Sequence, residues 1–241
     1  MLTKTRGIVF KTLKYGETSL IVDIYTEAHG LRKYIINGVR SKKAKVQASL
    51  LQVMSLVDLV AYNREDRDLN RIKEIRAGYV FQSVPFNVKK GAVGLFMAEV
   101  ARKTLRETEE NVALFNFLYD SFQYLDATPH PIGNLHLHFL LELSVFLGFI
   151  PSGKYDEETP FFDLQEGVFV PQAPLHLHFL QDKQSQLLDQ LLNCQLQECH
   201  QIMINAEERR NLLRQILEYY QLHLENLPEI KAHLILQEVL G

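Results

Sequence analysis

The sequence has little cysteine and no long uninterrupted apolar run. Cys194 and Cys199 are the only cysteines among 241 residues, and their spacing fits neither a Cys-x-x-Cys redox motif nor a four-ligand zinc site. The most apolar stretch, residues 135–149, is interrupted by histidine, glutamate and serine, so it falls short of the roughly 20 apolar residues of a membrane span. The first residues lack the apolar segment of a secretory signal. We therefore expect a cytoplasmic protein with no metal, no cofactor and no membrane span.

Sequence signatures of catalysis are also missing. The chain contains no Gly-x-Ser-x-Gly elbow, no Gly-rich phosphate loop, no His-Glu-x-x-His and no Gly-x-Gly-x-x-Gly. His176 and His178 would share one face of a strand, which is the best arrangement for metal binding in this sequence. No third residue of a suitable type stands at a spacing that would bring it close to them. A metal hydrolase is therefore the least favoured alternative, and the sequence predicts a protein that is not an enzyme.

Charge is distributed unevenly along the chain. Residues 1–80 hold 15 Lys and Arg against 8 Asp and Glu, whereas residues 81–241 hold 11 against 21. The net charge of −3 therefore combines a basic first part with an acidic second part. Clustered positive charge attracts phosphates by releasing counterions, so this asymmetry predicts that a polyanion binds to the first part.

The hydrophobic pattern divides the chain into two domains of different class. From residue 6 to 79 apolar residues alternate with a period close to two, and five strand candidates predict an OB-type barrel over residues 1–80, with an SH3-like barrel as the alternative. Residues 81–241 show helical spacing, broken by a short hairpin near 160–171 that turns at Glu166-Gly167. The predicted fold class is α+β: a five-stranded OB-fold barrel followed by a mostly α-helical domain.

One hexapeptide occurs twice. Leu-His-Leu-His-Phe-Leu stands at residues 135–140 and again at 175–180, with different flanking residues. Repeat architectures need similarity along a whole unit and at least about three copies. We interpret this repetition as coincidence.

A basic loop is the best candidate for nucleic-acid binding. It follows a predicted strand, and a solvated surface is the alternative interpretation of such a charge run. A strand that carries further cations and an aromatic ring would place phosphate contacts and a stacking surface side by side. The predicted DNA-binding residues are Arg40, Lys42, Lys43 and Lys45 in the loop, and Arg32, Lys33 and Tyr34 in the strand before it.

Several blocks of sequence resemble one known family. They include Tyr-Gly-Glu-Thr-Ser at 15–19, Asn-Gly-Val-Arg at 37–40 and Leu-Gly-Phe-Ile-Pro at 147–151. These blocks are similar to the bacterial recombination and repair family RecO. The resemblance implies a DNA repair and recombination mediator that binds single- and double-stranded DNA, anneals complementary strands and helps to load recombinase onto DNA coated by single-stranded-DNA-binding protein. It further implies a cytoplasmic, nucleoid-associated location.

The resemblance also implies partners and one departure from the family. RecR and the acidic C-terminal tail of the coating protein are the implied partners, the tail being received on the helical domain, where Arg102, Lys103 and Arg106 form a candidate binding cluster. Many members carry a four-cysteine zinc site after the Leu-Gly-Phe-x-Pro motif. Residues 152–170 contain no cysteine, so we expect no zinc there and a hairpin held by packing of Phe161, Phe162, Val168 and Phe169.

A function of another class remains open. A protein-only adaptor could use the basic barrel to recognise an acidic protein partner instead of DNA. Charge reversal of the basic loop separates the two hypotheses, because an adaptor would lose its partner and keep its DNA binding.

Overall fold

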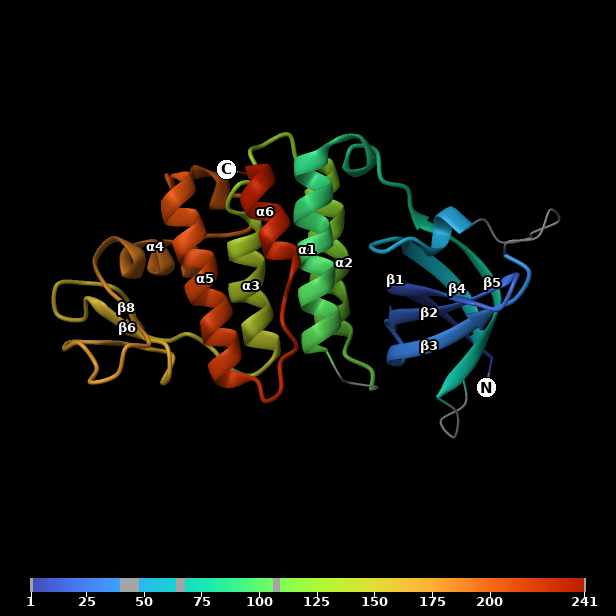
Figure 1. Ribbon diagram of the computed structural model, residues 1–241, viewed down its shortest axis with the longest axis horizontal. Coiled ribbons are helices and arrows are strands. Elements are labelled where there is room, and N and C mark those ends of the chain that lie inside the picture. Colours follow the sequence, from blue (N-terminus) through green and yellow to red (C-terminus); the bar gives the residue numbers. More distant parts are fainter. Residues whose placement is uncertain (1, 40–47, 64–67, 106–108, 241) are drawn as a thin grey trace. The chain divides into compact units, whose positions relative to one another are not determined.

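A computed structural model describes residues 2–39, 48–63, 68–105 and 109–240 (Figure 1). The chain forms two compact units, Met1–Thr128 and Pro129–Gly241, which are described separately below.

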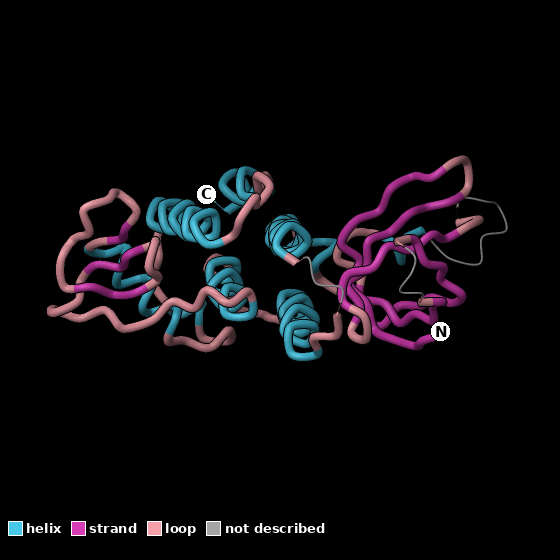
Figure 2. Tube along the Cα trace, turned by 90° about the horizontal axis from the view of Figure 1, so that it is seen from below, coloured by secondary structure: helices cyan, strands magenta, loops and turns pink. Residues whose placement is uncertain are grey.

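The first unit contains the predicted five-stranded barrel. Its strands are β1 (Leu2–Tyr15), β2 (Ser19–Thr26), β3 (Gly30–Ile36), β4 (Leu56–Tyr62) and β5 (Leu69–Tyr79), with a 3-10 turn at Ala48–Leu51. They are ordered β1-β2-β3-β5-β4, and pairing of β1 with β4 closes the sheet (Figure 2). All neighbours are antiparallel except β3 and β5. This closed barrel is consistent with the OB fold predicted from the strand count.

Alternate residues of each strand fill the barrel. Val22, Ile24, Tyr34, Val57 and Leu59 belong to one buried cluster. Strands present alternate side chains to opposite faces, so the residues between these ones point outward. Polar or charged side chains can occupy the outer positions without disturbing the core.

A β-bulge explains the irregular spacing of apolar residues in β5. Leu59 is paired with Ile75 and Ala61 with Ile72, and the register shifts between these two pairs. The extra residue, Lys73, lets Ile72 and Ile75 both pack against the barrel core although they are three residues apart. The three-residue spacing of Ile72 and Ile75 is therefore that of a bulged strand.

Helices α1 (Val88–Thr104) and α2 (Val112–Ala127) complete the first unit. The ring of Tyr25 on β2 stacks between Phe10 and Phe115, with centroid distances of 6.1 and 6.2 Å. Arg6 binds Glu27 on the barrel and donates to Oδ1 of Asn116 on α2 at 2.7 Å. The barrel strands thus end at Tyr79, close to the predicted boundary, while the compact unit continues through α2 to Thr128.

Asp126 fastens the segment that follows the barrel to the end of α2. Its carboxylate accepts backbone N–H bonds from Gln82, Ser83 and Val84 at 2.7–2.8 Å, and the hydroxyl of Tyr79 at 3.0 Å. Burial opposes ionisation of this group, but the hydrogen bonds outweigh it and hold the pKa of Asp126 at about 2. These bonds explain why α2 and the barrel form one unit.

The second unit is built around one buried helix. Helix α3 (Leu135–Phe146) is joined by α4 (Asp182–Leu192), α5 (Ala206–His223), α6 (Ala232–Leu240) and a 3-10 turn at Cys199–Gln201. Six leucine and phenylalanine side chains of α3 are buried, and the hydroxyl of Tyr220 on α5 donates to the carbonyl of Leu140 at 2.6 Å. Asn205 and Glu208 form the capping box that starts α5.

A small sheet stands beside these helices (Figure 1). It consists of β6 (Phe161–Asp163), β7 (Val168–Val170) and β8 (Phe179–Leu180), in the order β7-β6-β8. The first two strands form the predicted hairpin, which turns through Gly167 at a φ of 70°.

Aromatic packing holds this hairpin, as expected from its lack of cysteine. Phe162 and Phe169 are buried and meet edge to face at 4.9 Å, and Phe162 also contacts Tyr219 on α5. Phe161 and Val168 are only half-buried. Since residues 152–170 supply no thiolate, they do not fit a four-cysteine zinc site.

The repeated hexapeptide adopts two conformations. Residues 135–140 form the first turns of α3 and are buried throughout. Residues 175–180 instead run toward and into β8, with the side chains of Leu175 and Leu177 fully exposed. There His176 binds Asp163 at 3.3 Å and His178 binds Glu218 at 2.5 Å.

None of the described helices is both long enough and apolar enough to pass through a lipid bilayer. In the same part of the chain, no three His, Cys, Asp or Glu residues come together as metal ligands would.

Candidate nucleic-acid interface

The outer surface of the barrel strands carries two adjacent rows of side chains, called here the barrel face. Cross-strand pairing defines the first row, because partners in a sheet point to the same side. Its members are Leu13 on β1, Ile21 on β2, Ile35 on β3, Arg71 on β5 and Tyr62 on β4. None of the five is fully buried, so the row is open along its length.

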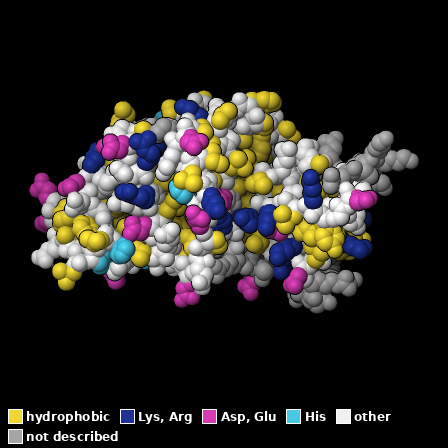
Figure 3. All heavy atoms as spheres, viewed as in Figure 1, with side chains coloured by type: hydrophobic (Ala, Val, Ile, Leu, Met, Phe, Trp, Pro, Cys, Tyr) yellow, Lys and Arg dark blue, Asp and Glu magenta, His cyan; other side chains and the backbone are white. Residues whose placement is uncertain are grey.

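The second row lies two residues further along the same strands. It contains Lys11, Asp23, Lys33 and Leu69. Asp23 is the one carboxylate of the two rows and stands between two lysines. Among the described residues, no carboxylate lies within ion-pair distance of Lys11, Lys33 or Arg71. Figure 3 shows hydrophobic and cationic side chains next to one another on the barrel. This combination can bind both the phosphates and the bases of a nucleic acid.

Other cations of β5 are already partnered. Arg76 is bound to Asp58 at 3.0 Å, and Lys73 lies 3.7 Å from Glu74. Their carboxylates reduce the positive potential on that side of the barrel. The barrel face is therefore the more favourable surface for a polyanion.

The structure contradicts one predicted binding residue. Tyr34 is fully buried in the barrel core, and its hydroxyl donates to Oδ1 of Asn63 at 2.9 Å. Burial raises the pKa of Tyr34 to about 12. The prediction that its ring stacks on bases is wrong, because Tyr34 points inward from β3 while Lys33 points outward.

The remaining predicted residues have different outcomes. Lys33 is exposed on the barrel face, and Arg32 is half-buried and points to the same side as Tyr34. Arg40, Lys42, Lys43 and Lys45 lie outside the described residues.

Four residues of this surface were missed in the sequence: Lys11, Arg71, Tyr15 and Tyr62. Lys11 and Arg71 are isolated cations within strands, so no charge run marks them. Tyr15 stands in a segment of turn composition, and Tyr62 is the last residue of a predicted strand, beside a charged turn. The period of two along β1, in which Lys11 and Tyr15 share one face with Leu13, is the signal that could have found the two residues of that strand.

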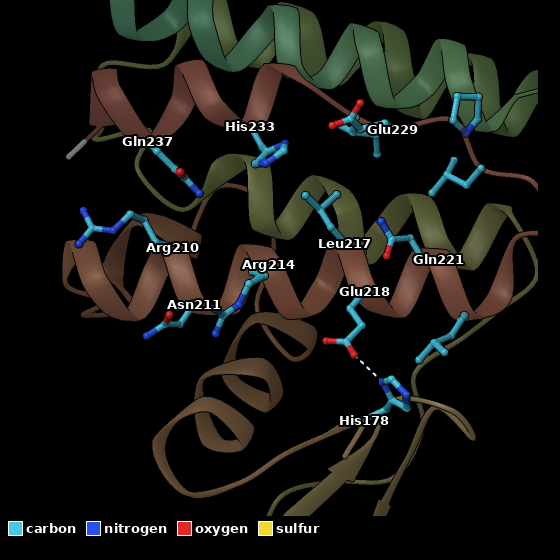
Figure 4. A pocket seen from close by; sticks show the side chains of 14 residues that line it. His178, Arg210, Asn211, Arg214, Leu217, Glu218, Gln221, Glu229, His233 and Gln237 are labelled. Carbon is cyan, nitrogen blue, oxygen red and sulfur yellow. Dashed lines mark hydrogen bonds and ion pairs between the residues drawn. The ribbon is translucent and has the colours of Figure 1, made fainter. Parts of the chain in front are cut away.

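A groove between α5 and α6 is the second candidate site (Figure 4). Arg210 and Arg214 come from α5 and His233 from α6, and apolar residues such as Leu227 and Ile230 line the groove between them. The groove has a volume of about 560 Å³.

The charge balance of this groove favours an anion. Glu218 is bound to His178, and Glu229 lies 3.6 Å from Lys231. Arg210 and Arg214 are exposed, and no described carboxylate lies within ion-pair distance of either. The groove can thus hold apolar side chains together with a carboxylate.

The predicted helical cluster is only partly available. Lys103 on α1 is bound to Glu99 one turn earlier, and Arg102 is half-buried. Arg106 lies outside the described residues.

Two models of one protein family match this chain. The family model "Recombination protein O N terminal" matches residues 1–80, and "Recombination protein O C terminal" matches residues 86–231. The chain belongs to the recombination protein O (RecO) family. The first match ends where the barrel strands end, and the second begins just before α1.

Full-length relatives carry the same name. "DNA repair protein RecO" of Phocaeicola vulgatus is 36% identical over 239 residues, which cover 99% of each chain. The protein of that name from Bacteroides fragilis is 38% identical over 240 residues, again 99% of each chain, and that from Christiangramia forsetii is 36% identical over the full length of both. The family recognised from the sequence blocks is thereby confirmed, and this chain is a DNA repair protein of that family.

Proposed function

We propose that this RecO-family protein binds single- and double-stranded DNA through the barrel face, anneals complementary strands and helps to load recombinase onto DNA coated by single-stranded-DNA-binding protein. The observation that supports this most directly is the pair of rows on the barrel, where Lys11, Lys33 and Arg71 stand among apolar side chains. OB-fold proteins bind oligonucleotides on this kind of surface. The activity requires binding and release only, and it takes place on the nucleoid.

Annealing follows from the charge of the barrel. Two DNA strands repel each other, and cations that neutralise phosphates reduce this repulsion. The basic loop with Arg40, Lys42, Lys43 and Lys45, which follows β3 in the sequence, belongs to the same proposal as a further source of phosphate contacts.

We place the acidic, apolar tail of the coating protein in the groove between α5 and α6. Arg210 and Arg214 would bind its carboxylates, and Leu227 and Ile230 its apolar side chains. Arg102, Lys103 and Arg106 remain a second candidate cluster for this tail. RecR is the proposed second protein partner.

Charge reversal on the barrel face tests the DNA-binding proposal. The variant Lys33→Glu/Arg71→Glu should bind single strands more weakly, and the slope of log affinity against log salt should become shallower by about 1.4, which is 0.7 for each lost phosphate contact. Lys183→Glu, an exposed lysine on α4, makes the same kind of charge change far from the proposed site along the chain and should leave both quantities unchanged. Salt-independent binding by the wild type would contradict the proposal.

The same variants separate the mediator from an adaptor. Fluorescence anisotropy measures DNA binding, and annealing of complementary oligonucleotides precoated with single-stranded-DNA-binding protein measures activity. An adaptor would keep full DNA affinity in the double variant and in a variant with Lys42, Lys43 and Lys45 changed to Glu, while it lost a protein partner.

A further inference from the structure

We propose that Tyr15 and Tyr62 are base-stacking residues that give the barrel its preference for unpaired bases. In this arrangement a single strand crosses the barrel face from β1 to β4, with its bases toward the sheet. The inference rests on the proposed DNA binding and adds the residues that distinguish a single strand from a duplex.

Exposure singles out these two rings. Tyr15 is 53% exposed and Tyr62 is 48% exposed, whereas Tyr25 and Tyr34 of the same barrel are fully buried. An exposed tyrosine ring presents a flat apolar surface to which any base can stack, independent of sequence.

Strand pairing places Tyr62 in the first row of the barrel face and Tyr15 next to that row, on the same outer surface. Tyr62 is paired with Arg71 and so ends the first row on β4. Tyr15 is paired with Ser19, two residues beyond the pair of Leu13 and Ile21, and it therefore points to the same side as Leu13. The two tyrosines stand at opposite ends of the path across the strands.

The path between the rings suits a short single strand. It crosses from β1 over β2, β3 and β5 to β4, which is four interstrand spacings, or about 19 Å along the surface. The side chains between are Ile21, Ile35 and Arg71, so the path has an apolar floor and one cation, with no carboxylate. This length corresponds to the smallest OB-fold site, about four nucleotides.

Duplex DNA cannot use these rings in the same way. Its bases are stacked on each other inside the helix, so only phosphates and groove edges reach the protein. Cations then contribute to both forms of DNA, while Tyr15 and Tyr62 contribute to the single strand alone.

The experiment compares two forms of DNA on the full chain. Affinities for a fluorescein-labelled oligothymidylate and for a duplex of the same length are measured by anisotropy for the wild type, Tyr15→Ala, Tyr62→Ala and the two Tyr→Phe variants. We expect each Ala variant to lose roughly 5- to 150-fold in single-strand affinity, the effect of removing one stacked base. Duplex affinity should stay unchanged, and Phe should restore single-strand binding because it retains the ring.

Controls make the result specific to base stacking. Phe86→Ala removes another exposed aromatic ring, outside the barrel strands, and should change neither affinity. The wild type should bind an abasic oligonucleotide as weakly as the Ala variants bind oligothymidylate. The Ala substitutions should cause little further loss of affinity for the abasic oligonucleotide.

The outcomes distinguish this inference from the function on which it rests. Equal losses for both forms of DNA, or no loss in either Ala variant, would overturn the stacking role and leave DNA binding by the barrel intact. A wild-type protein that binds neither form would overturn the proposed function itself.

Discussion

Replacement of Asp126 by Asn tests how the barrel is fastened to α2. The buried carboxylate accepts three backbone N–H bonds and the hydroxyls of Tyr79 and Ser83, and its side chain is almost inaccessible, at 3% exposed. The substitution removes the charge and replaces one acceptor oxygen with an NH₂ group that cannot accept these bonds. We expect the unit that contains the barrel and α2 to lose stability.

The magnitude follows from the pKa of the group. A fall of the pKa from 3.8 in the unfolded chain to about 2 in the folded one corresponds to about 2 kcal/mol of stabilisation by the ionised form. A depressed pKa stabilises the fold at all pH values above the unfolded pKa, and this contribution is lost as the pH falls through the folded pKa. The difference between wild type and Asp126→Asn should therefore be about 2 kcal/mol at neutral pH and should shrink between about pH 4 and pH 2.

Equilibrium urea unfolding, followed by far-UV circular dichroism at a series of pH values, measures this difference. Asp120→Asn, an exposed position on the same helix, should change the unfolding free energy by less than about 0.5 kcal/mol. A difference for Asp126→Asn that stays constant from neutral pH down to pH 2 would refute the role assigned to its charge.

Three further predictions concern single side chains. Tyr34→Phe should destabilise the barrel by about 1 kcal/mol through loss of the bond to Asn63, and anisotropy should show unchanged DNA affinity because the ring is internal. Burial, together with Arg209, lowers the pKa of His136 from 6.5 to about 3. Because this group favours the fold above pH 6.5, the stability of the helical unit should fall as the pH drops below that value. Thermal melting should show this fall, and it should be less steep in His136→Leu. Gly167→Ala should lower the melting temperature of the helical unit, since φ is positive there and the added Cβ would lie 2.8 Å from the Tyr219 hydroxyl.

The barrel and the helices could be predicted from periodicity, whereas parts of the site could not. The alternation in β2 and β3 and the three- and four-residue spacing in α2, α4 and α5 arise from burial of one face, which the sequence records directly. The strand β5 was obscured because its bulge at Lys73 shifts the phase of the pattern. The phase shift is set by pairing with β4, which lies elsewhere in the sequence, so the pattern of β5 by itself does not reveal it.

The direction of side chains in the candidate site also depends on strand pairing, which the local sequence does not show. Tyr34 stands next to Lys33, and proximity in sequence suggested that both serve one surface, but adjacent residues of a strand point to opposite faces. Closure of the barrel determines which face of each strand points inward. Tyr15 and Tyr62 lie far apart in the chain, and only the order of strands brings them to one surface.

The hexapeptide found in both α3 and the stretch leading to β8 has a practical consequence. An antibody raised against Leu-His-Leu-His-Phe-Leu would encounter one copy shielded inside the native protein and another whose first two leucines, Leu175 and Leu177, project into solvent. It should bind a single epitope on the intact molecule and two after denaturation. The same six residues thus adopt different conformations in different structural surroundings.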